Sequence, residues 1–278
     1  MGRDSFLGTV IVALVLCVVC SVLVSGAAVF LHGYQETNKR LYEKKNILKA
    51  AGLIRDKELE DEGAAEADTA VIAPSAKQIE EIYSERIKRV LVNLDDGSIV
   101  PEDKVDYDNY DPKEAADNPD DSEPIPEDEG PTPGLDRRPK MQFVYEVMAK
   151  GDSNKIEKYV LPVYGKGLWS TLYGFLAVDA DGETIRGITF YEHGETPGLG
   201  GEVENAKWQA KWDGKLAYDE DGEVIINVVK GTAAPDDKAY TVDGLSGATI
   251  TTKGVSDFVQ YWLGPDGFMP FLEKQSKS

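Results

Sequence analysis

The pattern of apolar and polar positions divides the chain into an uncharged N-terminal run, a charged middle part and a C-terminal half of short apolar runs. From Gly8 to Leu31 no residue is charged, and the run is long enough to cross a bilayer as a helix of about 20 residues. A cleaved signal peptide is the alternative because Ser25 and Ala27 form a small-x-small site, but such apolar segments run only about 7 to 15 residues. We predict a short tail over residues 1–7 and a retained transmembrane helix over residues 8–31.

A helical pattern continues beyond this span. Apolar residues recur near helical spacing among charges from Gln35 to Ala51, and Gly52 follows as a C-terminal cap. We therefore predict a juxtamembrane helical segment within residues 32–60. More positive charges follow the span than precede it, and this bias alone places the large domain in the cytoplasm, although long domains can cross the membrane despite flanking charge. The positive residues that follow are Lys39, Arg40, Lys44, Lys45 and Lys49, against Arg3 before the span.

The charged middle part of the chain contains one predicted helix followed by an acidic stretch. Ile79 to Val92 has the pattern of a helix, although its last residues fit the start of a strand equally well. Pro101 to Pro139 is rich in Asp, Glu and Pro and poor in residues that pack, so we predict an acidic, flexible surface insertion that contributes little to any site. A docking segment for a basic partner is the alternative.

Beyond Lys140 short apolar runs alternate with glycine and Asp-Gly turns, which predicts strands at "QFVYEVM", "TLYGFLAV", "IRGITFY" and "EVIINVV". The turn between Ala177 and Thr184 predicts an antiparallel hairpin. Helices are expected from about Gly201 to Trp212 and from about Ala248 to Leu263. The predicted class is α+β: one soluble domain over residues 61–278 with a mainly antiparallel sheet flanked by helices.

The composition of the chain argues against some classes of function. The net charge of −20 argues against nucleic-acid binding, because phosphate backbones are bound by Lys and Arg. Cys17 and Cys20 have C-x-x-C spacing but lie in the apolar run, where we interpret them as packing residues. The soluble part has no thiol for a disulfide, a zinc site or an iron–sulfur cluster, and we predict no metal site.

Candidate chemistry lies in three glycine-containing segments at the ends of predicted elements: "YGKGLWS" from Tyr164, "EHGETPGLGGE" from Glu192 and "DGLSGATITTKG" from Asp243. Glycines let a backbone approach a ligand closely, and small residues before a helix leave N–H groups free for a phosphate. The strongest candidate is the stretch from Ser246 to Thr249. It leads into the last predicted helix and suits a phosphate.

Each segment also has a simpler interpretation. Ser246 can be an N-cap, and Pro197-Gly198 a tight turn. His193 fits a surface or hydrogen-bonded residue. A hydrolase that uses Ser246, His193 and Glu195 has weak support because no G-x-S-x-G motif is present. The occurrence of all three segments in one chain favours a ligand site.

The motif "DGLSGAT" resembles the flavinylation motif of FMN-binding domains. Together with "EHGETPGLG", "GKGLW" and one N-terminal span, the chain resembles the C subunit of the sodium-translocating NADH:quinone reductase. The G subunit of the related Rnf electron-transport complex carries similar domains, but "NILKAAGL" at Asn46 to Leu53 favours the reductase. The acidic stretch before Pro139 departs from that pattern.

The resemblance implies that FMN is joined through its phosphate to the hydroxyl of Thr249 by a separate flavin transferase. Asp243 is expected to be part of what the transferase recognises. A phosphate at a helix N-terminus is stabilised by free N–H groups and the helix dipole. The other residues expected to bind the cofactor are Ser246, Gly247, Ala248, Leu168, Trp169, His193, Glu195, Thr196, Gly198, Leu199 and Gly200.

The function implied is a one-electron relay by covalent FMN within a multisubunit membrane complex, with no side chain acting as catalytic acid or base. The expected partners are the other subunits, the flavin transferase and the membrane, without nucleic acid. The resemblance places the protein in a bacterial inner membrane with its soluble domain in the periplasm. A membrane-tethered module that binds FMN noncovalently is the remaining alternative.

Overall fold

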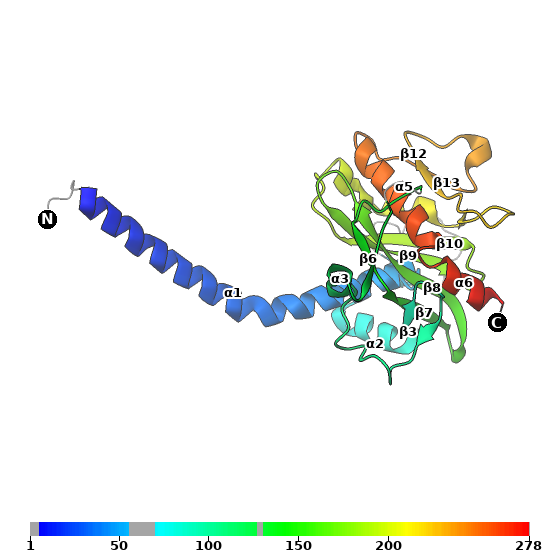
Figure 1. Cartoon of the computed structure of the whole chain (residues 1–278), viewed down its shortest axis with the longest axis horizontal. Coiled ribbons are helices and arrows are strands. Elements are labelled where there is room, and N and C mark those ends of the chain that lie inside the picture. The colour runs from blue at the N-terminus through cyan, green and yellow to red at the C-terminus, as the bar shows by residue number, and fades with distance from the viewer. Residues whose placement is uncertain (1–5, 56–69, 127–129, 278) are drawn as a thin grey trace. The chain divides into compact units, whose positions relative to one another are not determined.

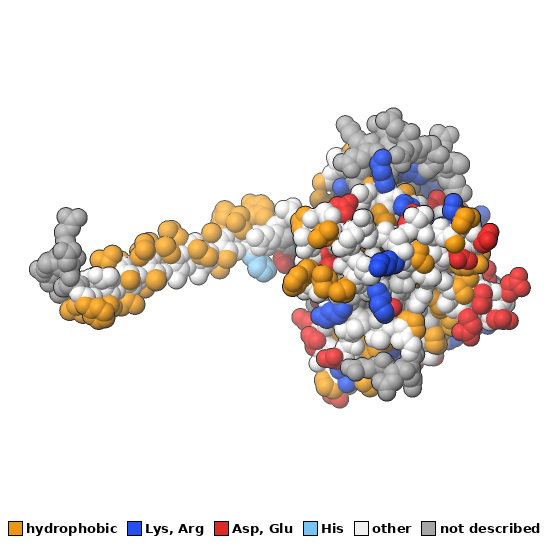
Figure 2. Space-filling model, turned by 90° about the horizontal axis from the view of Figure 1, so that it is seen from above, with side chains coloured by type: hydrophobic (Ala, Val, Ile, Leu, Met, Phe, Trp, Pro, Cys, Tyr) orange, Lys and Arg blue, Asp and Glu red, His pale blue; other side chains and the backbone are white. Residues whose placement is uncertain are grey.

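The structure is a computed structural model that describes residues 6–55, 70–126 and 130–277. It separates into two compact units, Met1–Glu43 and Lys44–Ser278. Helix α1 (Phe6–Ala50) makes up the described part of the first unit and supplies the opening residues of the second. By length and composition, α1 is able to cross a membrane. Figure 2 shows apolar side chains along this helix.

The helix has different limits from those predicted. It begins at Phe6, inside the predicted tail, and the predicted spanning and juxtamembrane segments are one continuous helix. No proline interrupts the sequence between them, and Thr37 Oγ1 donates a hydrogen bond to Gly33 O within the same turn. The prediction of a cap at Gly52 is confirmed, because Gly52 has φ +72° and the Leu53 N–H donates to Leu48 O at 2.9 Å. Residues 56–60 of the predicted segment lie outside the described residues.

A seven-stranded antiparallel sheet forms the centre of the second unit, in the order β11-β10-β9-β8-β7-β3-β4 (Figure 1). The prediction of a hairpin is confirmed, because β9 and β10 pair in antiparallel register on either side of the turn at Gly182. The strands are β3 (Ile87–Asn93), β4 (Ile99–Val100), β7 (Met141–Ala149), β8 (Asp152–Lys166), β9 (Thr171–Asp179), β10 (Thr184–Glu192) and β11 (Lys215–Leu216).

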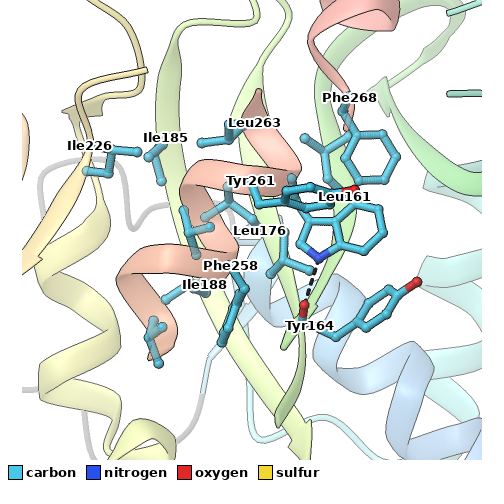
Figure 3. Close-up of a cluster of buried hydrophobic side chains, with 14 of the residues drawn as sticks. Leu161, Tyr164, Leu176, Ile185, Ile188, Ile226, Phe258, Tyr261, Leu263 and Phe268 are labelled. Atoms are coloured by element: carbon cyan, nitrogen blue, oxygen red, sulfur yellow. Dashed lines mark hydrogen bonds between the residues drawn. The ribbon is translucent and has the colours of Figure 1, made fainter. Parts of the chain in front are cut away.

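One face of the sheet is covered by α5 (Thr249–Leu263) and α6 (Met269–Ser276), drawn in orange and red in Figure 1. The hydrophobic core between this face and the two helices contains Leu161 and Val163 of β8 and Phe258 and Trp262 of α5. Figure 3 shows these layers and the hydrogen bond from Trp262 Nε1 to Tyr164 O, which measures 2.7 Å. A helix is therefore fixed across the strands that lead into the glycine segments.

The other face is covered by the last turns of α1 and by α2 (Ala76–Arg86). Val160 of β8 faces this side, as expected from the alternation of side chains along a strand. Thr189 Oγ1 donates to Asn46 O at 3.0 Å. A Cβ on Gly187 would lie 2.6 Å from Ala50 O, so this glycine permits the close approach of α1. The helix end is thus part of the domain core.

Some elements differ from the predicted ones. The longest strand, β8, was not predicted, since it begins with charged residues and contains Pro162. Its pairing with β7 extends to Val160, and beyond that point its partner is β9. The segment from Ile79 to Val92, whose end fitted either a helix or a strand, changes from one to the other: α2 ends at Arg86 and β3 begins at Ile87.

The predicted helix from Gly201 to Trp212 is wrong as a single element, because Asn205 caps a new helix within it and divides the segment. The predicted strand "EVIINVV" contributes only β12, which pairs in parallel with β13 outside the large sheet. The elements in these regions are η3 (Gly200–Glu204), α4 (Ala206–Gln209), η4 (Ala210–Trp212), β12 (Asn227–Val229), η5 (Pro235–Asp237) and β13 (Thr241–Asp243). Nearer the N-terminus, β1 (Ile54–Arg55) pairs in parallel with β2 (Val71–Ile72).

The acidic segment over residues 101–139 contains α3 (Pro112–Asp117), β5 (Ser122–Pro124) and β6 (Arg137–Pro139). The prediction that little in it packs is wrong for its described residues, because Tyr107 is buried against Leu91 and Phe143. Its acidic side chains accept backbone hydrogen bonds in turns, as Asp111 does at the N-cap of α3. Its end also contacts the end of β8, since Lys166 N donates to Pro133 O at 2.8 Å.

We expect Tyr107→Ala to lower the free energy of unfolding by about 2–4 kcal/mol, because a buried aromatic ring would leave a cavity beside Phe143. Urea unfolding of the detergent-solubilised chain measures the change. Asp108→Ala is the matched control, because that side chain is 93 % exposed. Equal stability of the two variants would contradict a packed acidic segment.

Candidate functional site

The candidate site lies at the N-terminus of α5, where β13 leads through "GLSGA" into the helix. Gly247 has φ +72°, a left-handed conformation that glycine adopts without strain. The N-cap residue is Ala248, which has no side chain to cap the helix, so the interpretation of Ser246 as the N-cap is wrong. Within the described part of the chain, the backbone N–H groups of Thr249, Ile250 and Thr251 have no protein acceptor. This helix therefore presents free donors at its positive end.

The threonines of this turn differ in environment. Thr249 is exposed, whereas Thr251 and Thr252 are 1 % and 3 % exposed. Thr251 Oγ1 donates to Glu195 Oε2 at 2.6 Å, and Thr252 Oγ1 accepts from Leu245 N at 3.1 Å. Thr249 is thus the one threonine of the three whose hydroxyl is open to a reacting group.

Glu195 connects the glycine segments. Its Oε1 accepts hydrogen bonds from Trp169 N at 2.8 Å and Ser170 N at 3.2 Å, and its Oε2 accepts from Thr251. The residue is 6 % exposed. Burial acts to raise the pKa of this carboxyl. The hydrogen bonds from the Thr251 hydroxyl and from the backbone N–H groups of Trp169 and Ser170 outweigh burial and hold the pKa below its usual range.

This lowered pKa predicts a pH-dependent stability. A carboxyl whose pKa is depressed by folding stabilises the fold above its unfolded-state pKa, and that contribution is lost as pH falls through the folded-state pKa. We expect the wild type to be more stable than Glu195→Gln at about pH 7, and we expect this difference to shrink below about pH 4. Urea unfolding at several pH values measures it, and a difference that grows on acidification would contradict the bonding described.

Exposed apolar side chains lie on the segments that border the start of α5. Leu168 and Trp169 are 47 % and 71 % exposed on the turn after β8, and Leu199 is 44 % exposed. Leu199 lies over Gly247, where a Cβ would be 3.0 Å from its Cδ2. Ile250, which is 59 % exposed, belongs to the same turn as Thr249 and was missed in the sequence. Its position one residue after the motif was the available signal.

The segment "EHGETPGLG" forms a turn, as predicted for Pro197-Gly198. Leu199 N donates to Thr196 O at 3.1 Å, and Gly198 has φ +77°. Gly200 lies against the Glu195 bond to Thr251, since a Cβ would be 2.5 Å from Glu195 Oε2.

His193 lies beside this turn and borders a hollow of about 470 Å³. Its Nδ1 accepts a hydrogen bond from Glu195 N at 3.2 Å. Its Nε2 is buried 3.3 Å from Glu204 Oε1 but makes no aligned hydrogen bond within the described residues. No hydrogen bond between described residues joins His193 to Ser246, so the structure does not support the hydrolase arrangement.

Asp243 lies at the end of β13 and is engaged by the protein. Its Oδ2 is 2.7 Å from Lys211 Nζ and its Oδ1 accepts from Ala233 N at 2.8 Å. The Lys211 ammonium and then the Ala233 N–H lower the pKa of this carboxyl. Its backbone carbonyl accepts from Trp208 Nε1.

Metal-binding residues do not gather in the described ranges. No group of three or more His, Cys, Asp or Glu residues there is placed to hold a metal ion. Cys17 and Cys20 are exposed and unpaired on α1.

Comparison with known proteins identifies the class of this domain. The family described as FMN-binding domain matches residues 167–264, which include the turn after β8, the turn at Gly198 and the start of α5. The fold and the site thus define an FMN-binding domain behind one N-terminal apolar helix.

Full-length relatives define the family. The chain is 40% identical to the C subunit of the Na(+)-translocating NADH-quinone reductase of Yersinia pestis over 98% of this chain and 94% of that protein. It is 42% identical to the protein of the same name from Pseudomonas aeruginosa, over 99% and 98%. The crystal structure of Shewanella oneidensis NqrC superposes with a TM-score of 0.72 at 32% identity, covering 87% of this chain and all of that one. The chain belongs to the family formed by the C subunits of Na(+)-translocating NADH-quinone reductases. This membership favours the reductase over the Rnf family.

Proposed function

We propose that the chain carries FMN joined by a phosphoester to Thr249 and relays electrons as a subunit of a sodium-translocating NADH:quinone reductase. The observation that carries the proposal is the exposed Thr249 hydroxyl in an uncapped first helical turn. Family membership supports the reductase, and the FMN-binding region supports the cofactor.

The residues at this turn fit a phosphate. The free N–H groups of Thr249, Ile250 and Thr251 point along the positive end of the α5 dipole, where an anionic phosphodiester is stabilised. Ser246 and Gly247 extend this set, because both are exposed and no described group accepts from their N–H groups. The phosphate would lie among these donors.

The apolar residues around the turn fit a flavin ring. Trp169 lies on the turn that Glu195 bonds to α5, Leu168 precedes it, and Leu199 lies over Gly247. All three side chains are exposed, and they suit an aromatic ring left partly open to solvent. FMN, when bound, supplies the one-electron chemistry. The side chains named here hold and orient the ring, and none is required as acid or base.

The partners follow from the family. The other subunits of the membrane complex are the partners in the electron relay, and a flavin transferase forms the Thr249 linkage. Helix α1 serves as a single-pass anchor in a bacterial inner membrane. We place the soluble domain in the periplasm, because transferases of this kind act on exported domains.

Orientation gives a separate prediction. An alkaline phosphatase fused after Ser278 is active only outside the cytoplasm, so we expect the fusion to be active in cells. A fusion that lacks residues 3–43, which removes the apolar part of α1 and keeps its last turns in the domain, is the inactive control. An inactive full-length fusion beside an active fluorescent reporter at the same position would place the domain in the cytoplasm, in line with the five positive residues after the span.

A noncovalent FMN module is separated from this proposal by one experiment. The chain is produced with and without the flavin transferase and then run on a denaturing gel under ultraviolet light. We expect a fluorescent band only with the transferase, since a covalent flavin stays with the denatured chain. Native protein that is yellow but gives a dark band would favour the noncovalent module.

A further inference from the structure

Glu195 is bonded to both elements that border the proposed flavin site. Its Oε1 accepts from the backbone N–H groups of Trp169 and Ser170, and its Oε2 accepts from the side chain of Thr251. The first two belong to the turn after β8, and Thr251 belongs to the first turn of α5. One carboxylate therefore joins a loop to a helix N-terminus.

Glycines close around this carboxylate on two sides. A Cβ on Gly167 would lie 2.7 Å from Glu195 Oε1, and a Cβ on Gly200 would lie 2.5 Å from its Oε2. Real Cβ atoms do not approach oxygen this closely, so the backbone at both positions packs directly on the carboxylate. With 6 % of Glu195 exposed, its oxygens face protein donors rather than an open surface.

The groups bonded to Glu195 are next to those that would hold FMN. Trp169 donates its N–H to Glu195 while its side chain is 71 % exposed. Thr251 is two residues after Thr249 on the same helical turn. Moving the carboxylate would therefore change the distance between the apolar surface and the attachment hydroxyl.

We propose that Glu195 is a positioning residue for the flavin site, which fixes the Trp169 turn relative to Thr249 through hydrogen bonds and does not itself contact the flavin. The inference rests on the proposed FMN attachment at Thr249. This positioning role depends on acceptor oxygens at residue 195 more than on its negative charge. A glutamine keeps one acceptor for the two N–H groups, and the Thr251 hydroxyl can rotate to accept from the amide.

The variants follow from these contacts and are made in the full chain, produced with the flavin transferase. Glu195→Ala removes every side-chain hydrogen bond of this residue, and Glu195→Gln keeps its shape. Thr251→Val removes the helix side of the connection, and Thr251→Ser restores its hydroxyl. Ser256→Ala is the control, because Ser256 is another buried hydroxyl of α5 and accepts from Val228 N away from Glu195.

The first readout is covalent flavin per chain, measured by fluorescence after denaturation. We expect a loss of about tenfold in Glu195→Ala and Thr251→Val, since a misplacement of about 1 Å is enough to cost a positioned reaction that much or more. Glu195→Gln, Thr251→Ser and Ser256→Ala should stay near wild type. Glu195→Ala with wild-type flavin content, Glu195→Gln as deficient as Glu195→Ala, or a Ser256→Ala loss equal to that of Thr251→Val would each overturn the proposal.

The second readout is hydrogen exchange at the amides of Trp169 and Ser170, measured on the chain produced without transferase. We expect both amides to be protected in wild type and Glu195→Gln and to exchange fast in Glu195→Ala. If wild type carries no covalent flavin, the functional proposal fails while this exchange pattern still supports the connection made by Glu195. Unchanged exchange in a folded Glu195→Ala protein would overturn it whatever the flavin content.

Discussion

Thr249→Ala should carry no covalent flavin and should keep its fold. The hydroxyl is the proposed attachment point, and loss of an exposed oxygen changes the free energy of unfolding by no more than about 0.5 kcal/mol. The measurements are in-gel flavin fluorescence and urea unfolding of the same preparation. Thr249→Ser should recover fluorescence because it restores an oxygen at the same place.

The neighbouring hydroxyls provide the matched controls for this result. Ser246→Ala should remain fluorescent, because Ser246 neither caps α5 nor supplies the attachment oxygen. Thr252→Val should remain fluorescent but lose about 1–3 kcal/mol of stability, since the buried Leu245 N–H would have no acceptor. A fluorescent Thr249→Ala band would contradict the assignment.

The second large effect is expected at Asp243. Asp243→Ala should lower the covalent flavin content about tenfold, the factor that corresponds to losing one hydrogen bond to a charged group. We assign the loss to recognition by the transferase. Asp243 also pairs with Lys211 and accepts a hydrogen bond from the Ala233 N–H. The same loss of flavin would result if the substitution only disturbed the local structure, so a control is needed.

Lys211→Ala is that control. It removes the ion pair and leaves the Asp243 carboxylate and its bond from Ala233 in place. A recognition role predicts near-normal flavin attachment in Lys211→Ala. Equal loss in Asp243→Ala and Lys211→Ala would show that the aspartate acts by holding the end of β13.

Local sequence patterns were sufficient for the elements closest to the site. The α+β class, the hairpin at Gly182 and the start of α5 near Thr249 were all predicted, because each depends on neighbouring residues. Small residues before an apolar helix mark its beginning, and an Asp-Gly turn marks a hairpin. The wrong cap at Ser246 shows the limit, since the choice of Ala248 follows from the left-handed Gly247 and not from side-chain chemistry.

The missed features depend on contacts between distant residues. Strand β8 contains a proline, and its pairing partners follow from the sheet, not from its own composition. The acidic segment packs through Tyr107, whose partners Leu91 and Phe143 lie far from it in sequence. Glu195 was expected to be part of the site, and its bonds to Trp169 and Thr251 are visible only once three segments have folded together.

Peptide mass spectrometry of the wild-type chain produced with the transferase tests the central claim most directly. Fragmentation of the peptide that contains Ser246 to Thr252 assigns the added mass of a phosphate-linked FMN to one residue. We predict that fragments ending before Thr249 are unmodified and that every fragment including Thr249 carries the flavin. An added mass that appears first at Ser246, Thr251 or Thr252, or an unmodified peptide from yellow protein, would contradict the account.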